Sequence, residues 1–137
     1  LRNMGMPSYL IASSLNGIIA QRLVRKICPH CKTPLSLPVP VCRSLGITAG
    51  ESGTDPLYTG AGCRNCNSTG FKGRVAIYEV MLVNEQSRDL ILKGASSADF
   101  KREVMRNGMS GLRDSAVKKM KQGLTSPDEV LRTTPAP

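Results

Sequence analysis

The sequence has no tryptophan, two phenylalanines and three tyrosines, so aromatic residues make up 4% of its 137 positions. Its core must be built mainly from Leu, Ile, Val, Met and Ala, which disfavours a large β-sandwich. No apolar run approaches the roughly 20 residues that span a bilayer, because basic residues interrupt the longest one, 18–27. The start of the chain also lacks the basic and then apolar layout of a signal peptide, so we expect a soluble piece of a larger protein.

Residues that build common catalytic sites are equally scarce. The chain has one histidine, His30, no Gly-x-x-x-x-Gly-Lys-Ser/Thr phosphate loop, and no carboxylate pair that stands out. We therefore expect no catalytic residue in this chain and no nucleotide hydrolysis by it alone. Nucleotide-binding residues are not assignable from the pattern, although Arg22 and Arg25 are candidates to approach a nucleotide or a neighbouring subunit.

Acidic residues are absent from the first fifty positions, which hold six Lys or Arg. The whole chain has 19 basic and 10 acidic residues, a formal net charge of +9. This imbalance indicates either an anionic partner or a solvated basic surface.

Two Cys-x-x-Cys pairs carry the strongest chemical signal. Each pair can wrap two sulfur atoms around one face of a metal ion, and two pairs complete a tetrahedron. A shell of four thiolates leaves no open coordination position, so the ion is predicted to be a structural Zn²⁺ and not a catalytic one. The predicted ligands are Cys28, Cys31, Cys63 and Cys66.

Other interpretations of the cysteines are weaker. Disulfides are not expected without an export signal, and four unliganded thiols would leave little to hold a loop so poor in apolar residues. A thiol–disulfide exchange site would need a βαβ pattern that is absent. His30 lies inside the first pair and Cys42 stands alone among prolines, so neither is expected to bind the metal.

Secondary structure can be predicted in outline for the first 83 residues. A helix is expected over 9–15, ended by Gly17, whereas the spacing in 17–27 fits a helix or a strand equally well. Cys, Pro, Gly, Ser and Thr dominate 28–73, which indicates a loop module that needs a cross-link. The β-branched residues of 74–83 predict a strand buried on both faces.

The remainder predicts four helices. Asn84, Ser96 or Ser97, Ser110 or Gly111, and Ser126 are the expected starts, and glycines at 94, 108 and 123 the expected stops. A tail over 133–137 is expected to be disordered. One shared core is expected from Leu90, Ile91, Phe100, Val104, Met105, Leu112, Ala116, Val117, Met120 and Val130.

Several short motifs together resemble the C-terminal part of the type II secretion and type IV pilus assembly ATPases. The resemblance covers roughly residues 1–133, and one departure is Ser115-Ala116, where members often have Asp-Gly. The motifs are Ser13-Ser14-Leu15, Ala20-Gln21-Arg22-Leu23-Val24-Arg25, the two cysteine pairs with Gly62, Gly70-Phe71-x-Gly73-Arg74, Ile77-Tyr78-Glu79-Val80, Gly108-Met109, Leu112-Arg113, Gly123-Leu124-Thr125 and Glu129-Val130-Leu131-Arg132.

The resemblance implies an α+β fold in which 1–27 ends a RecA-like ATPase core and 74–83 is the strand that returns to it. Related retraction motors replace the cysteine module by a short turn, which implies that 17–27 is also a strand and pairs with 74–83. The tetracysteine zinc module, 28–73, is then an insertion at the tip of a hairpin, and 84–132 is a C-terminal bundle of about four helices.

The resemblance also implies a function for the parent protein. It would be a homo-hexameric ATPase that uses ATP and Mg²⁺, lies in the cytoplasm at the inner-membrane face, and contacts an inner-membrane platform protein and other secretion or pilus components. No nucleic acid is expected as a partner. A nucleic-acid-binding zinc ribbon is the alternative, favoured by a pI of 9.7 but disfavoured because only Phe71 and Tyr58 are near enough to the metal for base stacking.

Overall fold

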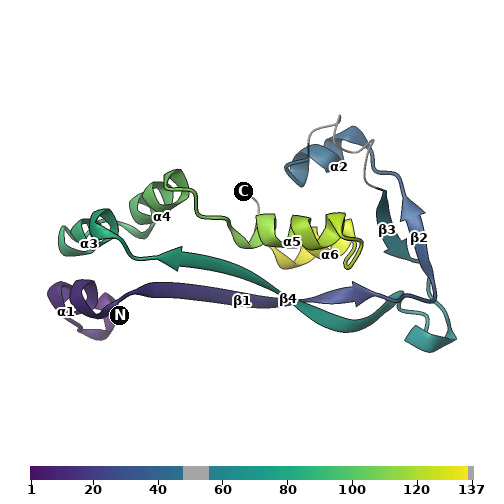
Figure 1. Ribbon diagram of the computed structural model, residues 1–137, viewed down its shortest axis with the longest axis horizontal. Coiled ribbons are helices and arrows are strands. Elements are labelled where there is room, and N and C mark those ends of the chain that lie inside the picture. Colours follow the sequence, from purple (N-terminus) through teal and green to yellow (C-terminus); the bar gives the residue numbers. More distant parts are fainter. Residues whose placement is uncertain (48–55, 136–137) are drawn as a thin grey trace. The chain divides into compact units, whose positions relative to one another are not determined.

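A computed structural model of the chain describes residues 1–47 and 56–135. In these ranges it contains six α-helices and two two-stranded sheets (Figure 1). This confirms the predicted mixture of helices and strands. None of the helices within these ranges combines the length and the hydropathy that a membrane crossing requires.

The first elements are a 3₁₀ turn, Arg2–Met4, and helix α1, Ser8–Ser14. Strand β1, Gly17–Ile27, follows and pairs with strand β4, Phe71–Leu82. The pairing is antiparallel, because Val83 N–H donates to Asn16 O at 3.0 Å and Cys28 N–H donates to Gly70 O at 2.9 Å. The structure thus confirms that 17–27 is a strand, which periodicity alone left open.

Burial along β4 alternates, which corrects the prediction of a strand buried on both faces. Ile77 and Met81 are buried, whereas Tyr78, Val80 and Leu82 are 47%, 49% and 77% exposed. Successive side chains of a strand point to opposite faces, so this pattern is that of a ribbon covered on one face.

Between the paired strands the described residues form only short elements, as the prolines predict. They are strand β2, Lys32–Leu35, helix α2, Val39–Ser44, strand β3, Leu57–Gly60, and a 3₁₀ turn, Arg64–Cys66. Strands β2 and β3 are antiparallel, with Lys32 opposite Gly60 and Leu35 opposite Leu57. The predicted loop module therefore has a small hairpin of its own, and its residues 48–55 lie outside the described ranges.

The four predicted C-terminal helices are present as α3, Glu85–Leu92, α4, Ser97–Arg106, α5, Leu112–Lys121, and α6, Pro127–Thr133. Three predicted caps are confirmed, since the side chains of Asn84, Ser96 and Ser126 each accept a backbone N–H in the first turn. The tail was predicted wrongly in part, because Thr133 lies in α6 and Thr134 is buried. Residues 136 and 137 lie outside the described ranges.

These helices do not share one core. The chain divides into a first unit, 1–20 with 79–111, and a second unit, the described residues of 21–78 with 112–137. Helices α3 and α4 belong to the first unit, and α5 and α6 to the second. This division into units does not test the predicted domain boundaries. It does correct the expectation that all four helices share a single core.

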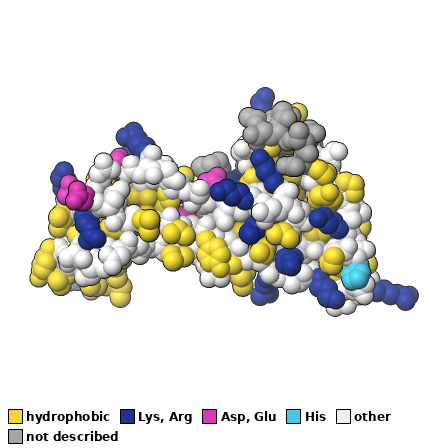
Figure 2. Space-filling model, viewed as in Figure 1, with side chains coloured by type: hydrophobic (Ala, Val, Ile, Leu, Met, Phe, Trp, Pro, Cys, Tyr) yellow, Lys and Arg dark blue, Asp and Glu magenta, His cyan; other side chains and the backbone are white. Residues whose placement is uncertain are grey.

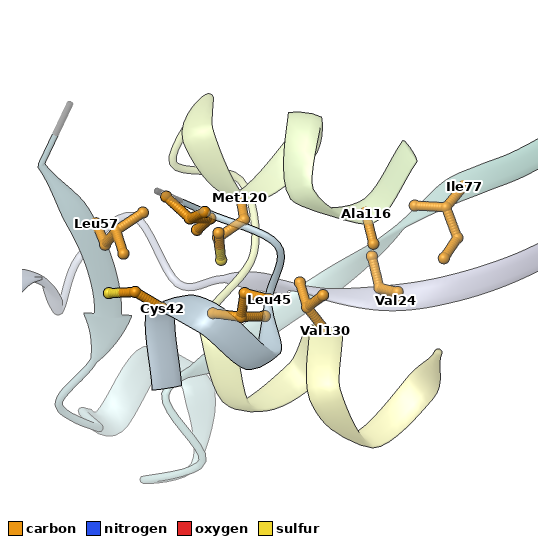
Figure 3. Packing of buried hydrophobic residues seen from close by; sticks show 9 residues of the cluster. Val24, Cys42, Leu45, Leu57, Ile77, Ala116, Met120 and Val130 are labelled. Atoms are coloured by element: carbon orange, nitrogen blue, oxygen red, sulfur yellow. The ribbon is translucent and has the colours of Figure 1, made fainter. Parts of the chain in front are cut away.

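The core of the second unit explains this division (Figure 3). Side chains from β1 and β4 meet α5 and α6 there, and residues of the cysteine module join them. Met105 of α4, predicted to be in the core, is instead 43% exposed, while Val104 is buried in the first unit. The buried cluster consists of Val24, Cys42, Leu45, Ile47, Leu57, Ile77, Ala116, Met120 and Val130.

A buried carboxylate attaches α6 to the edge of β1. The Glu129 side chain is fully buried and accepts from the Arg25 guanidinium at 2.8 and 3.0 Å, from Arg25 N–H at 3.0 Å, and from Arg132 at 2.8 and 3.1 Å. Burial by itself raises the pKa of this carboxyl, but hydrogen bonds from Arg25 and Arg132 outweigh it and hold the pKa at about 2.

We predict that Glu129→Gln lowers the free energy of unfolding by about 3 kcal/mol at neutral pH, because the substitution leaves both arginines without their carboxylate. The stabilisation by Glu129 is fully present above its ordinary pKa near 4.5 and is lost as the pH falls towards 2. Urea unfolding of both proteins at several pH values measures the difference, which should shrink in acid.

Asp99→Asn is the control, since Asp99 pairs with Arg102 on the exposed surface of α4. Its loss should change stability far less than the loss of Glu129, because solvent screens a pair on the exposed surface. Equal effects of the two substitutions, or a Glu129 effect independent of pH, would contradict the assignment.

Candidate metal centre

The four predicted cysteines come from both ends of the module. Cys28 follows β1 and Cys31 precedes β2, whereas Cys63 and Cys66 lie at the 3₁₀ turn between β3 and β4. Their sulfur atoms all lie within 4.8 Å of one another. In the part of the chain that the structure describes, they form the one such group of three or more Cys, His, Asp or Glu.

The distances between the sulfur atoms show whether the four cysteines form disulfides or are free thiols. Sγ of Cys28 lies 3.9 Å from that of Cys63, Cys31 lies 3.9 Å from Cys66, and Cys63 lies 3.7 Å from Cys66. A disulfide needs about 2.05 Å, so these are free thiols. Four sulfur donors this close together could hold a metal ion.

Each cysteine pair is held by a tight turn. Cys31 N–H donates to Cys28 O at 3.3 Å, and Cys66 N–H donates to Cys63 O at 3.2 Å. The chain leaves the second turn through Asn67 and Ser68, whose φ angles of 51° and 60° lie in the left-handed region. Asn is among the residues that tolerate this conformation best, so Asn67, just after the second pair, favours the left-handed backbone by which the chain leaves the turn.

Two backbone contacts hold the turns together. Ala61 N–H donates to Cys31 O, and Cys28 N–H donates to Gly70 O, both at 2.9 Å. Beside them, the backbones of Gly60 and Gly70 pass so close that a Cβ on either residue would collide with the other. Glycine is therefore required at both positions, which sequence analysis singled out only as part of a motif at Gly70 and missed at Gly60.

The surroundings of Cys31 and Cys66 shift the pKa values of their thiols in opposite directions. Burial raises the pKa of the Cys31 thiol to about 12, although the backbone of Gly62 donates to it. Burial also opposes ionisation of Cys66, but N–H groups of Cys63 and Gly70, 3.2 and 3.3 Å from its sulfur, lower its pKa to about 6. Four thiolates so close together repel one another, so a cation at their centre is needed to ionise all of them.

The two residues that were not expected to be ligands lie outside the cluster. His30 is exposed, and in Figure 2 its cyan side chain lies on the surface near several Lys and Arg side chains. Cys42 is buried in α2, where its sulfur lies 3.9 Å from Leu37 O, and it belongs to the apolar core. Neither side chain is part of the group of four clustered sulfur atoms.

The two arginines considered for nucleotide or subunit contacts are engaged within the chain. Arg22 donates to Thr133 O at 2.7 Å. Arg25 binds Glu129, and its guanidinium also lies 4.1 Å from the centre of the Phe71 ring. Thr133 is 111 residues from Arg22 in the sequence, and Glu129 is 104 residues from Arg25, so no local pattern could have predicted these two contacts.

The chain is similar in sequence to several known proteins. Residues 1–132 match the family model described as "Type II/IV secretion system protein". The chain is 44% identical over 135 residues to the type IV pilus assembly ATPase PilB of Myxococcus xanthus, covering 98% of this chain and 24% of that protein. It is 37% identical over 134 residues to the type II secretion system protein E of Pseudomonas aeruginosa, covering 98% and 26%.

A third relative, the type IV pilus assembly ATPase PilB of Thermus thermophilus, is 39% identical over 134 residues, which are 98% of this chain and 15% of that protein. The chain thus spans about a quarter or less of the length of the curated relatives it matches. Since the family model covers nearly all of its residues, the chain belongs to the type II/IV secretion system protein family.

Proposed function

We propose that this chain holds one structural Zn²⁺ through Cys28, Cys31, Cys63 and Cys66, within an ATPase that powers type IV pilus assembly or type II secretion. The convergence of the four sulfur atoms carries the zinc assignment. Zn–S bonds of about 2.3 Å in a regular tetrahedron place the sulfur atoms about 3.8 Å apart. The separations of 3.7 and 3.9 Å fit that shell.

The shell favours a structural ion. All four positions of a tetrahedral zinc would be filled by cysteine, which leaves none for water or substrate. The N–H groups of Cys63 and Gly70 stabilise negative charge on Cys66 and would orient this ligand. In this proposal the ion stiffens a segment in which glycine and proline are frequent.

ATP hydrolysis is proposed for the whole protein, with ATP and Mg²⁺ bound by parts that this chain does not contain. The names of the relatives as pilus assembly and secretion ATPases support this. The chain itself has no phosphate loop. We further propose that the parent works as a hexamer in the cytoplasm, at the inner-membrane face.

Within that motor, we propose that the cysteine module provides a rigid contact surface for the inner-membrane platform protein or for a neighbouring subunit. Charge supports a contact surface there. The sequence ranges of the second unit hold 13 Lys or Arg and 5 Asp or Glu, whereas those of the first unit hold 6 and 5. The net charge of +9 therefore belongs almost wholly to the unit with the cysteines, which favours an anionic partner surface.

Nucleic acid is a less well supported partner. The two aromatic rings near the cysteines are already covered by cations of the same chain, Phe71 by Arg25 at 4.1 Å and Tyr58 by Lys32 at 4.0 Å. A cation over one face of a ring leaves only the other face for stacking on a base. Fluorescence anisotropy with a labelled single strand should therefore show only weak binding that vanishes at moderate salt, and salt-resistant binding would favour the zinc-ribbon alternative.

We predict one zinc per purified chain, with sulfur as the sole ligand atom and Zn–S distances of about 2.3 Å. Cys63→Ser should lose the metal, whereas His30→Ala should retain it, because the His30 side chain is exposed and is not one of the four clustered ligands. Metal analysis and X-ray absorption spectroscopy make the measurement. Nitrogen ligation, or zinc loss in the His30 variant alone, would show that the assigned ligand set is wrong.

We also predict that the isolated chain neither binds nor hydrolyses ATP appreciably, because it lacks the phosphate loop. A phosphate-release assay and a fluorescent ATP analogue test this. Turnover that persists through purification and falls when a residue of this chain is changed would place catalytic groups here and contradict the proposal.

A further inference from the structure

We propose that metal binding at the four cysteines controls the docking of α5 and α6, so that the second unit folds with the metal while the first unit holds its structure without it. This inference rests on the proposed zinc binding. The sequence alone suggests something different, namely an inserted module in which the metal cross-links the module and nothing else.

The first observation is the backbone around the ligands. Ile27, the residue before Cys28, donates its N–H to Leu124 O at 2.9 Å, and the Thr125 hydroxyl donates to Arg25 O at 2.8 Å. Leu124 and Thr125 form the connection between α5 and α6. That connection is therefore bonded to the strand end that carries the first ligand.

The second observation is the contact between the β2–β3 hairpin and the end of α5. Gly123 has a φ of 68°, and a Cβ there would collide with the Lys32 ammonium and lie 3.0 Å from Cδ2 of Tyr58. Lys32 follows Cys31 directly and stacks on Tyr58. The hairpin thus covers the last turn of α5, immediately beside the second ligand.

The third observation is the shared core (Figure 3). Leu45 and Leu57 lie between the two cysteine pairs in the sequence, yet they belong to one buried cluster with Met120 of α5 and Val130 of α6. The Arg113 guanidinium of α5 adds a hydrogen bond to Ser44 O of α2 at 2.6 Å. The packing surface of α5 and α6 is therefore built in part from the segment that the metal would close.

These contacts make docking depend on the metal. The 31 residues between the cysteine pairs contain few apolar side chains, and ordering such a segment without a cross-link costs more conformational entropy than its burial recovers. Once it unfolds, the cluster loses Cys42, Leu45, Ile47 and Leu57. Helices of ten and seven residues are too short to persist without tertiary packing.

The first unit has contacts of its own. Helix α1 packs on α3, and α3 packs on α4. The Arg88 guanidinium of α3 donates to Ala12 O, and Asn107 donates to Gln86 Oε1 at 3.1 Å. No residue of the cysteine cluster belongs to this unit.

Hydrogen exchange on the zinc-loaded chain and on the same chain after chelation tests the proposal. Removal of zinc should speed amide exchange at least about tenfold in 112–133, as well as in the module, and leave 85–106 within about twofold. Unchanged exchange in 112–133 would overturn the coupling. Loss of protection in 85–106 as well would overturn the independence of the first unit.

Linkage provides a second test, because coupling between two sites is reciprocal. Met120→Ala, which changes a core side chain and none of the four proposed ligands, should weaken zinc retention against a chromophoric chelator at least about tenfold. Val104→Ala is the control, since Val104 is also a buried helix residue but lies in α4 of the first unit. Equal zinc retention in both variants would contradict the proposal.

If Met120→Ala does not fold even with zinc, Val130→Ala repeats the measurement with a smaller change in α6. A wild-type chain that binds no zinc would refute the proposed function itself. A chain that binds zinc but keeps α5 and α6 protected after chelation would refute only this further inference.

Discussion

Two turns that are separated by 31 residues meet at one point, and the second unit is organised around that meeting. Each turn supplies two sulfur atoms, and backbone hydrogen bonds from Ala61 and Cys28 connect them. Strands β1 and β4 enter and leave at this point, and the hairpin of β2 and β3 extends from it. A segment rich in glycine and proline could not reach this arrangement through the burial of its few apolar side chains alone.

The arrangement has consequences for how a motor of this family could use the unit. A part that transmits force must not deform when it is loaded, and a metal-closed module that shares a core with two helices meets this requirement better than a separate loop would. The excess of positive charge lies in the same unit. The module that we propose to be rigid and the excess of positive charge therefore lie in the same unit, where we propose a contact with the platform protein or a neighbouring subunit.

Glu129 connects α6 to β1 within the second unit. Its carboxylate accepts the Arg25 N–H at the edge of β1 and both guanidinium groups at once. A buried charge of this kind is tolerated only where it is fully hydrogen-bonded, and this one is. Arg25 thereby joins β1 to α6 through an ion pair within the second unit.

The sequence by itself determined those features that depend on a few neighbouring residues. The Cys-x-x-Cys spacing identified the four clustered sulfur atoms, and the caps at Asn84, Ser96 and Ser126 located three helix starts, because a turn or a cap needs only the atoms within one turn of chain. Motif resemblance added the family, and with it the pairing of β1 with β4.

Tertiary structure decided which surfaces share a core. Nothing near Met120 in the sequence shows that it packs with Leu45 and Leu57, and nothing near Glu129 shows that Arg25 binds it. Apolar periodicity reports that a helix has a buried face but not what covers that face. The partner is selected by the free energy of the whole packed chain, and for α5 and α6 the partners are strands β1 and β4 together with the cysteine module.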